Sequence, residues 1–444
     1  MRLSPLRALL VPLFVLSACT ISLPVQSTPT PPVTSYATVE AALRVLVERH
    51  VDKPSSKLLL EGAATDVVTF LKKQGTPGPA DIAPPTFTGK PDDDLRAFSG
   101  YLDQVLERTP ATARSELERQ AVNGMAKATN ECHTYYLDPD RAKNFNSPQR
   151  ERYSGIGARI QQPAPNTASL PEITQVFKDS PADKAGVQMG DRIKKVGDKE
   201  VAGLTAEEVA NMIRGPEGTP VSLVIVRGTT EKTLTITRAS LTVPDIVEQL
   251  VDSGQVGYVG ISNITTNVPR DLADSLGHLE QAGAIGWILD LRSDPGGLLE
   301  PAEQIASTFI KSGNVLYEVG RDGQAMPKPV NPKAFYPRQK PLAVLVNKYS
   351  ASGAEIVASA LQEHGAGRVF GEPTAGCISI ALPRELPDGG LLLYTYAKIQ
   401  SGVRKMDLGG KGVTPDEIVT RAPDENGDKV LDAAVAWLRS EAKP

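Results

Sequence analysis

Histidine and cysteine are scarce in this chain of 444 residues, which contains four histidines and three cysteines. These residues are scattered, and no group of them has the spacing of a metal site. Basic residues are not concentrated either, since the net charge is −4 and no long basic run follows the N-terminal segment. We therefore expect no nucleic-acid partner, no metal and no organic cofactor. The remaining composition, 40% hydrophobic and 23% charged residues, is that of an ordinary globular protein.

The extreme N-terminus is the segment that is directed to a membrane. Two arginines precede the apolar stretch Ala8–Leu16, which is too short to span a membrane and is typical of a signal peptide. The stretch runs into Leu-Ser-Ala-Cys, which resembles a bacterial lipoprotein signal whose cysteine, here Cys19, becomes the lipidated first residue. An ordinary signal peptide or a retained anchor is the alternative. We expect a signal peptide at 1–19 and a tether rich in Pro, Ser and Thr at 20–35. The protein would then be exported and anchored by lipid at the outer face of the cytoplasmic membrane, in the periplasm or cell envelope.

Apolar residues recur at helical spacing in the next part of the chain. This pattern predicts a helical N-terminal domain at 36–150, with helices over Val39–His50, Ser56–Gln74, Asp92–Arg108 and Ala111–Thr129. Short strands and turns replace the helical pattern from Tyr153 onward.

Strands and helices alternate after Pro244. The strand Val256–Ile261 precedes a helix at Pro269–Gln281, and the strand before Asp290 precedes a helix at Glu300–Ile310. This alternation predicts an α/β core at 243–423, in which the loops that follow the strands face one cleft. A closing amphipathic helix over Asp428–Leu438 is expected within 424–444.

The stretch Leu342–Cys377 contains the candidate nucleophile. Its apolar run Leu342–Val346 predicts a strand, and small residues then lead into a helical pattern that continues to Glu363. A strand, a tight turn and a helix lift a hydroxyl above the sheet and aim the unpaired N–H groups of the helix at the same place. Ser352 is therefore our candidate nucleophile. The alternative is that Ser350 and Ser352 only cap the helix.

A glycine pair in a second loop offers hydrogen-bond donors. The loop DLRSDPGGL at Asp290–Leu298 follows another apolar run, and its Gly296 and Gly297 can expose N–H groups to a neighbouring oxyanion. We expect the oxyanion to be held by the N–H groups of Gly353 and of Gly297, or of Gly296 in its place.

Together these segments resemble the core of the S41 peptidases, which are the carboxy-terminal processing (tail-specific) proteases and the tricorn-like proteases. Four motifs carry the resemblance in order: DLRxxPGGL, SASxxEI, GExTxG at 371–376 and GKGVxPD at 410–416. The resemblance spans about Val39 to Val419. It implies a multidomain α/β protein with a helical N-terminal domain, a β-rich PDZ domain and a protease core of the ClpP/crotonase type.

The β-rich segment from Ser154 to about Arg238 carries the resemblance to a PDZ domain, which we expect at 153–240. The matching stretches are Ser154–Ile160, Glu172–Phe177, Ser180–Val187, Gly190–Ile193 and Val221–Arg227. The resemblance implies that a peptide strand adds to a sheet edge and that the N–H groups of Gly155, Ile156 and Gly157 bind its C-terminal carboxylate. A helix at Thr205–Arg214 would line this groove. The alternative is a domain that only packs against its neighbour.

The sequence departs from its family at the catalytic base. Carboxy-terminal processing proteases usually have a lysine directly after GExTxG and a glutamine shortly beyond, and here these positions are Cys377 and Ala381. The usual Ser-Lys pair is therefore absent. One hypothesis is that His133 is the base, because it matches a histidine of the tricorn-like branch. Glu131 or Asp407 would then be the carboxylate that orients it. The other hypothesis is that the catalytic apparatus has decayed and that the protein binds peptides or scaffolds other proteins.

The same departure suggests a disulfide. If His133 reaches Ser352, its neighbour Cys132 lies near Cys377, and in an oxidising compartment the two thiols could join the helical domain to the core. Two independent buried cysteines are the alternative.

The sequence is thus interpreted as that of an exported serine endopeptidase of the S41 type, which binds the C-terminal tails of unstructured proteins through its PDZ domain. A catalytically inactive peptide-binding lipoprotein is the main alternative, and a purely structural envelope protein is a third. The sequence specifies neither an adaptor nor an oligomeric state.

Overall fold

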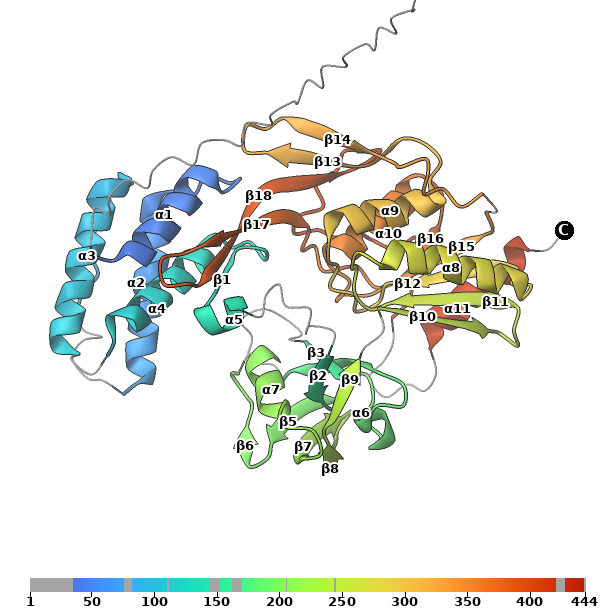
Figure 1. The fold of residues 1–444 in the computed structure, drawn as a ribbon, viewed down its shortest axis with the longest axis horizontal. Helices are drawn as coiled ribbons and strands as arrows, with labels where there is room; N and C mark the ends of the chain where they lie inside the picture. The colour runs from blue at the N-terminus through green and yellow to red at the C-terminus, as the bar shows by residue number, and fades with distance from the viewer. Residues whose placement is uncertain are drawn as a thin grey trace, which may run out of the picture.

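The chain divides into a helical domain, a small β-rich domain and an α/β core, and Figure 1 shows the three in a computed structural model. The structure describes residues 35–75, 82–109, 112–143, 152–161, 170–204, 206–242, 245–337, 339–420 and 428–442. The expected signal peptide, the tether and Cys19 lie outside these ranges. Within them, no helix is both long and apolar enough to cross a membrane.

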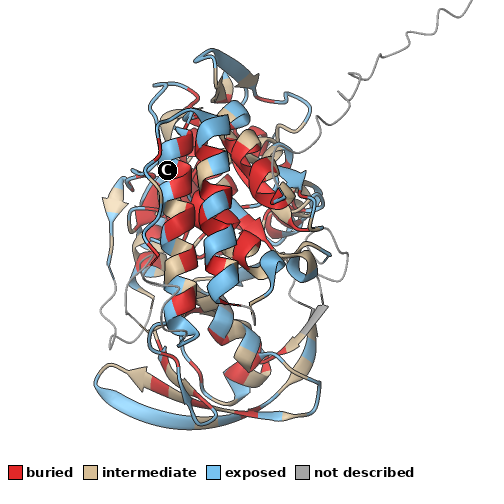
Figure 2. Cartoon of the chain, turned by 90° about the vertical axis from the view of Figure 1, so that its left-hand side faces the viewer, coloured by how far each residue is buried: buried red, intermediate tan, exposed pale blue. Residues whose placement is uncertain are grey.

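Four helices close to their expected bounds form the N-terminal domain. They are α1 (Ala37–Arg49), α2 (Ser56–Lys73), α3 (Pro91–Arg108) and α4 (Arg114–Ala128). Figure 2 faces this domain and shows buried and exposed residues on opposite sides of its helices. Helices α2 and α4 approach closely because glycine faces glycine, and a Cβ at Gly124 would lie 2.3 Å from the carbonyl oxygen of Gly62.

The helical domain is not built from 36–150 alone. Its apolar core also contains Leu386, Leu392 and Tyr394, which come from the C-terminal half of the chain. Leu392 and Tyr394 belong to a five-stranded sheet, and Leu386 directly follows one of its strands; the sheet runs between the helices and the α/β core in Figure 1. Its strands are β1 (Tyr135–Leu137), β13 (Asn314–Gly320), β14 (Ala325–Pro329), β17 (Ser379–Glu385) and β18 (Leu391–Ser401). Strand β1 pairs with β18 across more than 250 residues, whereas β13–β14 and β17–β18 are hairpins of neighbouring strands.

The β-rich domain has its own apolar core. A sheet in the order β3-β4-β5-β7-β8 packs with helix α7, and strands β2 and β9 pair antiparallel where the chain enters and leaves. The elements are β2 (Arg152–Gly155), β3 (Ala158–Gln161), β4 (Glu172–Val176), α6 (Pro181–Lys184), β5 (Arg192–Val196), β6 (Lys199–Glu200), α7 (Ala206–Ile213), β7 (Pro220–Arg227), β8 (Thr230–Thr237) and β9 (Ala239–Thr242). Helix α7 is the helix expected at 205–214.

The α/β core is a six-stranded sheet in the order β10-β11-β12-β15-β16-β19, parallel from β11 to β19. Its elements are β10 (Ile246–Val251), β11 (Val256–Ile261), α8 (Val268–Gln281), β12 (Gly286–Asp290), α9 (Leu299–Phe309), β15 (Leu342–Val346), α10 (Gly353–Glu363), β16 (Arg368–Gly371), β19 (Glu417–Ile418) and α11 (Lys429–Glu441). Helices α8, α9 and α10 cover one face, and α11 packs on the other. Strands β12 and β15 are buried throughout, as their unbroken apolar runs predict.

The parallel strands place the candidate loops together. The loops that follow β12, β15 and β16 leave the same edge of the sheet, because parallel strands end on one side. The predicted α/β core, with its loops facing one cleft, is confirmed.

Candidate active site

Ser352 occupies a sharp turn between β15 and α10. Its φ of 52° and ψ of −116° lie outside the regions that L residues usually occupy. The Ser352 N–H lies 2.8 Å from the carbonyl oxygen of Cys377 and 3.0 Å from Oε2 of Glu355. Ser350, by contrast, is fully buried, and its hydroxyl donates to the carbonyl of Leu291 at 2.7 Å. The turn therefore leaves Ser352 partly exposed, whereas Ser350 holds the turn to the loop after β12 through its hydrogen bond to Leu291.

Glu355 holds this turn against the next loop. Its buried carboxylate accepts hydrogen bonds from the Thr374 hydroxyl at 2.6 Å and from the Gly376 N–H at 2.8 Å, in addition to the Ser352 N–H. Burial raises the pKa of Glu355, while these donors act in the opposite direction. Our sequence reasoning gave Glu355 no role. A carboxylate three residues after a serine at a helix start is the capping-box spacing that would have identified it.

The glycine loop after β12 packs directly on the nucleophile turn. A Cβ at Gly296 would lie 2.4 Å from the Gly353 nitrogen and 2.8 Å from the Ser352 Cβ. The Gly296 N–H is occupied, since it donates to Oδ1 of Asp294 at 2.9 Å. Within the described part of the chain, the N–H groups of Gly297 and Gly353 have no protein acceptor. The structure therefore offers Gly297, not Gly296, as the partner of Gly353 in an oxyanion hole.

Asp294 stabilises the glycine loop, and our sequence analysis gave it no role. The residue is completely buried, and its carbonyl oxygen accepts the Ala351 N–H at 3.0 Å, which ties the loop to the nucleophile turn. Burial raises the pKa of Asp294 to about 8, although the Gly296 N–H and the charge of Arg159 act against the rise. The group is therefore a neutral acid at pH 7.

His133 lies beside a partly buried carboxylate on the helical-domain side of the cleft. Its Nδ1 is 3.5 Å from Oε1 of Glu131 and 2.9 Å from the Ser379 hydroxyl. The backbone N–H of His133 also donates to Oε2 of Glu131 at 2.8 Å. Burial would raise the pKa of Glu131, but hydrogen bonds from His133 and Thr395 outweigh it and lower the pKa to about 2.

Of the two candidate orienting carboxylates, the structure places Glu131 next to His133. Asp407 accepts the N–H of Gly409 and, among the described contacts, none joins it to His133. The other three histidines lie elsewhere. His50 is buried against Thr134, His278 contacts Glu248, and His364 contacts the carbonyl of Asn314.

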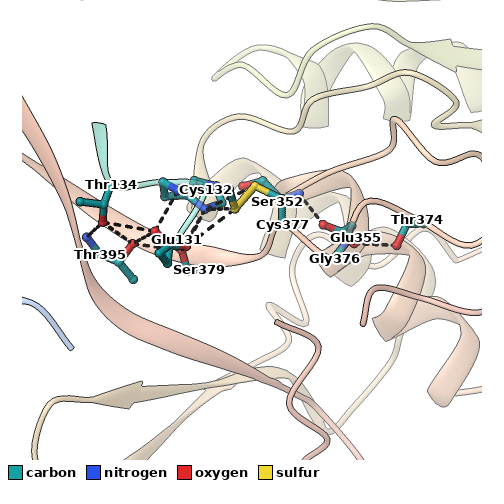
Figure 3. Close-up of a disulfide and its surroundings, with 11 residues drawn as sticks. Glu131, Cys132, Thr134, Ser352, Glu355, Thr374, Gly376, Cys377, Ser379 and Thr395 are labelled. Carbon is teal, nitrogen blue, oxygen red and sulfur yellow. Dashed lines mark hydrogen bonds and ion pairs between the residues drawn. A yellow bond between two sulfur atoms is a disulfide. The ribbon is translucent and has the colours of Figure 1, made fainter. Parts of the chain in front are cut away.

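Cys132 and Cys377 are joined by a disulfide across the cleft, with their Cα atoms 6.0 Å apart. Figure 3 shows Ser352 next to this bond, with Glu131 and Ser379 on one side and Glu355 on the other. The disulfide thus occupies the position at which the family lysine was expected. His133 Nδ1 lies 3.7 Å from the Cys377 sulfur, but in the described part of the chain no hydrogen bond joins His133 to Ser352. A cleft of about 610 Å³ opens here, lined by residues that include Glu131, Cys132, Ala351 and Cys377.

The predicted carboxylate-binding loop connects β2 to β3. Ile156 is buried, its carbonyl accepts the Ala182 N–H at 2.7 Å, and Gly157 lies against Ser180. Gly155 ends β2. From β3, Arg159 donates to the carbonyl oxygens of Ser262, at 2.7 Å, and of Ser293, so this domain contacts the loop that carries Asp294.

Comparison with known proteins agrees with this geometry. Residues 255–419 match "Peptidase family S41", and residues 172–227 match "PDZ domain". The "Carboxyl-terminal-processing protease" of Synechocystis sp. is 36% identical over 304 residues, which cover 67% of this chain and 70% of that protein. This chain belongs to peptidase family S41.

The S41 assignment extends to other relatives and to the fold. A "Probable CtpA-like serine protease" of Staphylococcus haemolyticus is 33% identical over 303 residues, which cover 68% of this chain and 60% of that protein. The match therefore spans about 60% of the length of such relatives. The solved "Photosystem II D1 C-terminal processing protease" superposes with a TM-score of 0.62 at 23% identity, over 93% of this chain and 99% of that one. The predicted multidomain S41 fold with a PDZ domain is confirmed.

Proposed function

We propose that this S41 chain is a serine endopeptidase in which Ser352 is the nucleophile. The observation that carries the proposal is a serine in a strained turn at a helix N-terminus, beside two N–H groups that have no protein acceptor in the described structure. Preorganised donors of this kind stabilise the negative charge that develops when a carbonyl is attacked. Nothing in this argument depends on the missing lysine.

His133 is the proposed base. The Ser352 hydroxyl would give its proton to His133 while its oxygen bonds to the carbonyl carbon, and the Gly297 and Gly353 N–H groups would hold the oxyanion. His133 would then return the proton to the leaving amine, and a water molecule would release the acyl group by the reverse sequence. Because Glu131 and Ser379 lie at Nδ1, Nε2 is the nitrogen left for Ser352. Hydrogen bonds between catalytic groups are often long before substrate binds and shorten in the complex.

Two further parts of the proposal rest on sequence. We propose that the PDZ domain binds C-terminal tails of unstructured proteins at Gly155, Ile156 and Gly157, where backbone N–H groups would meet the carboxylate. We also propose that the protein is exported and held to the membrane by lipid at Cys19. The contact of Arg159 with the carbonyl of Ser293 supports a link between tail binding and the catalytic loop.

The test is cleavage of an unfolded protein that ends in an apolar tail, with the products identified by mass spectrometry. We expect the full-length chain and a Ser440→Ala control, altered on the exposed end of α11, to cleave alike, and Ser352→Ala to be inactive. Cleavage by Ser352→Ala at the wild-type rate would refute the assignment of the nucleophile. Binding of the tail without any cleavage would instead favour the hypothesis of a non-catalytic peptide-binding protein, which the presence of Cys377 at the position of the family lysine suggested.

A further inference from the structure

The disulfide lies within a cluster of metal-ligating side chains. Cys132, His133 and Cys377 each direct a ligand atom into one region, and these atoms lie within 4.8 Å of one another. The nearest carboxylate oxygen, Oε1 of Glu131, lies 3.7 Å from the Cys132 sulfur and 3.5 Å from His133 Nδ1. Two sulfurs and one imidazole nitrogen make up a donor set that Zn²⁺ accepts, with its fourth position open to water.

We propose that reduction of the Cys132–Cys377 disulfide opens a Zn²⁺ site made of Cys132 Sγ, Cys377 Sγ and His133 Nδ1, with the fourth position taken by water. The reductant is a dithiol, which supplies two electrons and two protons and leaves as its own disulfide. The two cysteine thiols then lose their protons as they bind the ion. Metal binding and the disulfide are therefore mutually exclusive states of one site.

The distances between donor atoms match tetrahedral zinc. With Zn–S near 2.3 Å and Zn–N near 2.0 to 2.1 Å, sulfur and nitrogen ligands lie about 3.5 Å apart around a tetrahedral ion. The observed distances from His133 Nδ1 to the sulfurs of Cys132 and Cys377 are 3.3 Å and 3.7 Å.

Only the two sulfurs must move apart, to about 3.8 Å around the same ion. A Cα–Cα distance of 6.0 Å leaves room for side-chain rotation to achieve this without displacing either backbone. His133 is already oriented, because its backbone N–H donates to Oε2 of Glu131 at 2.8 Å, while Oε1 of Glu131 accepts the Ser379 hydroxyl at 2.8 Å. Hydrogen bonds of this kind orient metal ligands in proteins.

The site is also accessible. Cys132 is exposed, and Cys132, Cys377 and Glu131 all line the cleft of about 610 Å³. A dithiol and an ion can therefore reach the sulfurs from solvent. If the proposed function is correct, zinc on Nδ1 would hold His133 as a ligand and withdraw it from catalysis.

The experiment measures zinc on the full-length chain, before and after treatment with dithiothreitol and anaerobic desalting. We expect about one ion per reduced chain, essentially none per oxidised chain, and competition with a chromophoric chelator to give the affinity. Cobalt used as a probe should give a sulfur-to-metal charge-transfer band in the reduced protein. Circular dichroism should show that the reduced chain keeps its fold.

Variants assign the ligands. Cys132→Ser, Cys377→Ser and His133→Ala should each weaken zinc binding by about 100-fold or more, whereas His278→Ala, a histidine on α8, should leave it unchanged. Equal affinity in the reduced wild type and in Cys132→Ser would overturn the proposal, as would unfolding on reduction. A separate experiment measures activity. The rate of Ser352-dependent cleavage by the reduced chain should fall when zinc is added and recover when a chelator removes it. Zinc binding without peptidase activity in any state would refute the proposed function and leave the metal site standing.

Discussion

Replacing Asp294 by asparagine tests whether a buried neutral acid supports the oxyanion loop. The carboxyl is completely buried, and its pKa is raised from 3.8 to about 8, chiefly by burial. As the pH rises above about 4, the unfolded chain releases this proton while the folded chain keeps it until about pH 8. The unfolded state is therefore increasingly favoured across this window, and the wild type loses stability that Asp294→Asn retains.

The magnitude follows from the shift. Each pKa unit corresponds to about 1.4 kcal/mol, so the cost to the folded wild type is about 1.6 kcal/mol at pH 5 and about 5 kcal/mol at pH 8. The free energy of unfolding of Asp294→Asn, measured relative to the wild type, should thus be about 4 kcal/mol higher at pH 8 than at pH 5, so that the variant is relatively more stable at pH 8.

Urea unfolding followed by tryptophan fluorescence measures this difference in the right domain. The chain has two tryptophans, Trp287 in β12 and Trp437 in α11, and both belong to the α/β core. Asp274→Asn, an exposed change on α8, is the matched control and should show the same offset from the wild type at both pH values. A pH-independent offset for Asp294→Asn, within about 1 kcal/mol, would refute the reasoning.

Three other predictions follow from particular contacts. Gly296→Ala should reduce cleavage by about 100-fold or more, because its Cβ would lie 2.4 Å from the Gly353 nitrogen and displace an oxyanion donor; a rate within twofold of wild type would contradict this. Gly124→Ala should lower the free energy of unfolding of the helical domain by about 1–3 kcal/mol, because its Cβ would meet the Gly62 carbonyl, whereas Gly100→Ala has open space and should not. The free energies of unfolding of Gly124→Ala and Gly100→Ala are measured by denaturant titration, followed by far-ultraviolet circular dichroism. Cys19→Ala should move the expressed protein from the membrane fraction to the unbound fraction, and an unchanged distribution would contradict lipidation there.

Cys377, which stands at the position of the family lysine, has a structural role in this chain. Cys377 does not leave a gap beside Ser352, because its sulfur is bonded to Cys132 and its carbonyl oxygen accepts the Ser352 N–H. One residue therefore contacts both the strained turn and the segment that carries His133. In this chain, the position at which carboxy-terminal processing proteases usually have a lysine forms a covalent link between the helical domain and the core.

Local patterns were sufficient for much of the fold. The helices of the N-terminal domain, the buried strands β12 and β15 and the turn at Ser352 follow from apolar spacing and from small residues, which act within a few positions of one another. Strands β13, β14 and β17 were not predicted: β14 and β17 pair with strands adjacent in sequence, and of these pairings only that of β13 with β18 joins distant segments. The predicted helical domain was also incomplete, since Leu386, Leu392 and Tyr394 complete its core.

Sequence patterns were sufficient to indicate the family and the strand, turn and helix around Ser352, because each depends on residues that are close together in the chain. Which groups meet at the cleft depends on the tertiary structure alone. It placed Glu131 and not Asp407 beside His133, occupied the N–H of Gly296 with Asp294, and joined two cysteines that are 245 residues apart. The side chains of the proposed zinc site are brought together by the fold, and apart from the adjacent Cys132 and His133 they carry no short-range pattern.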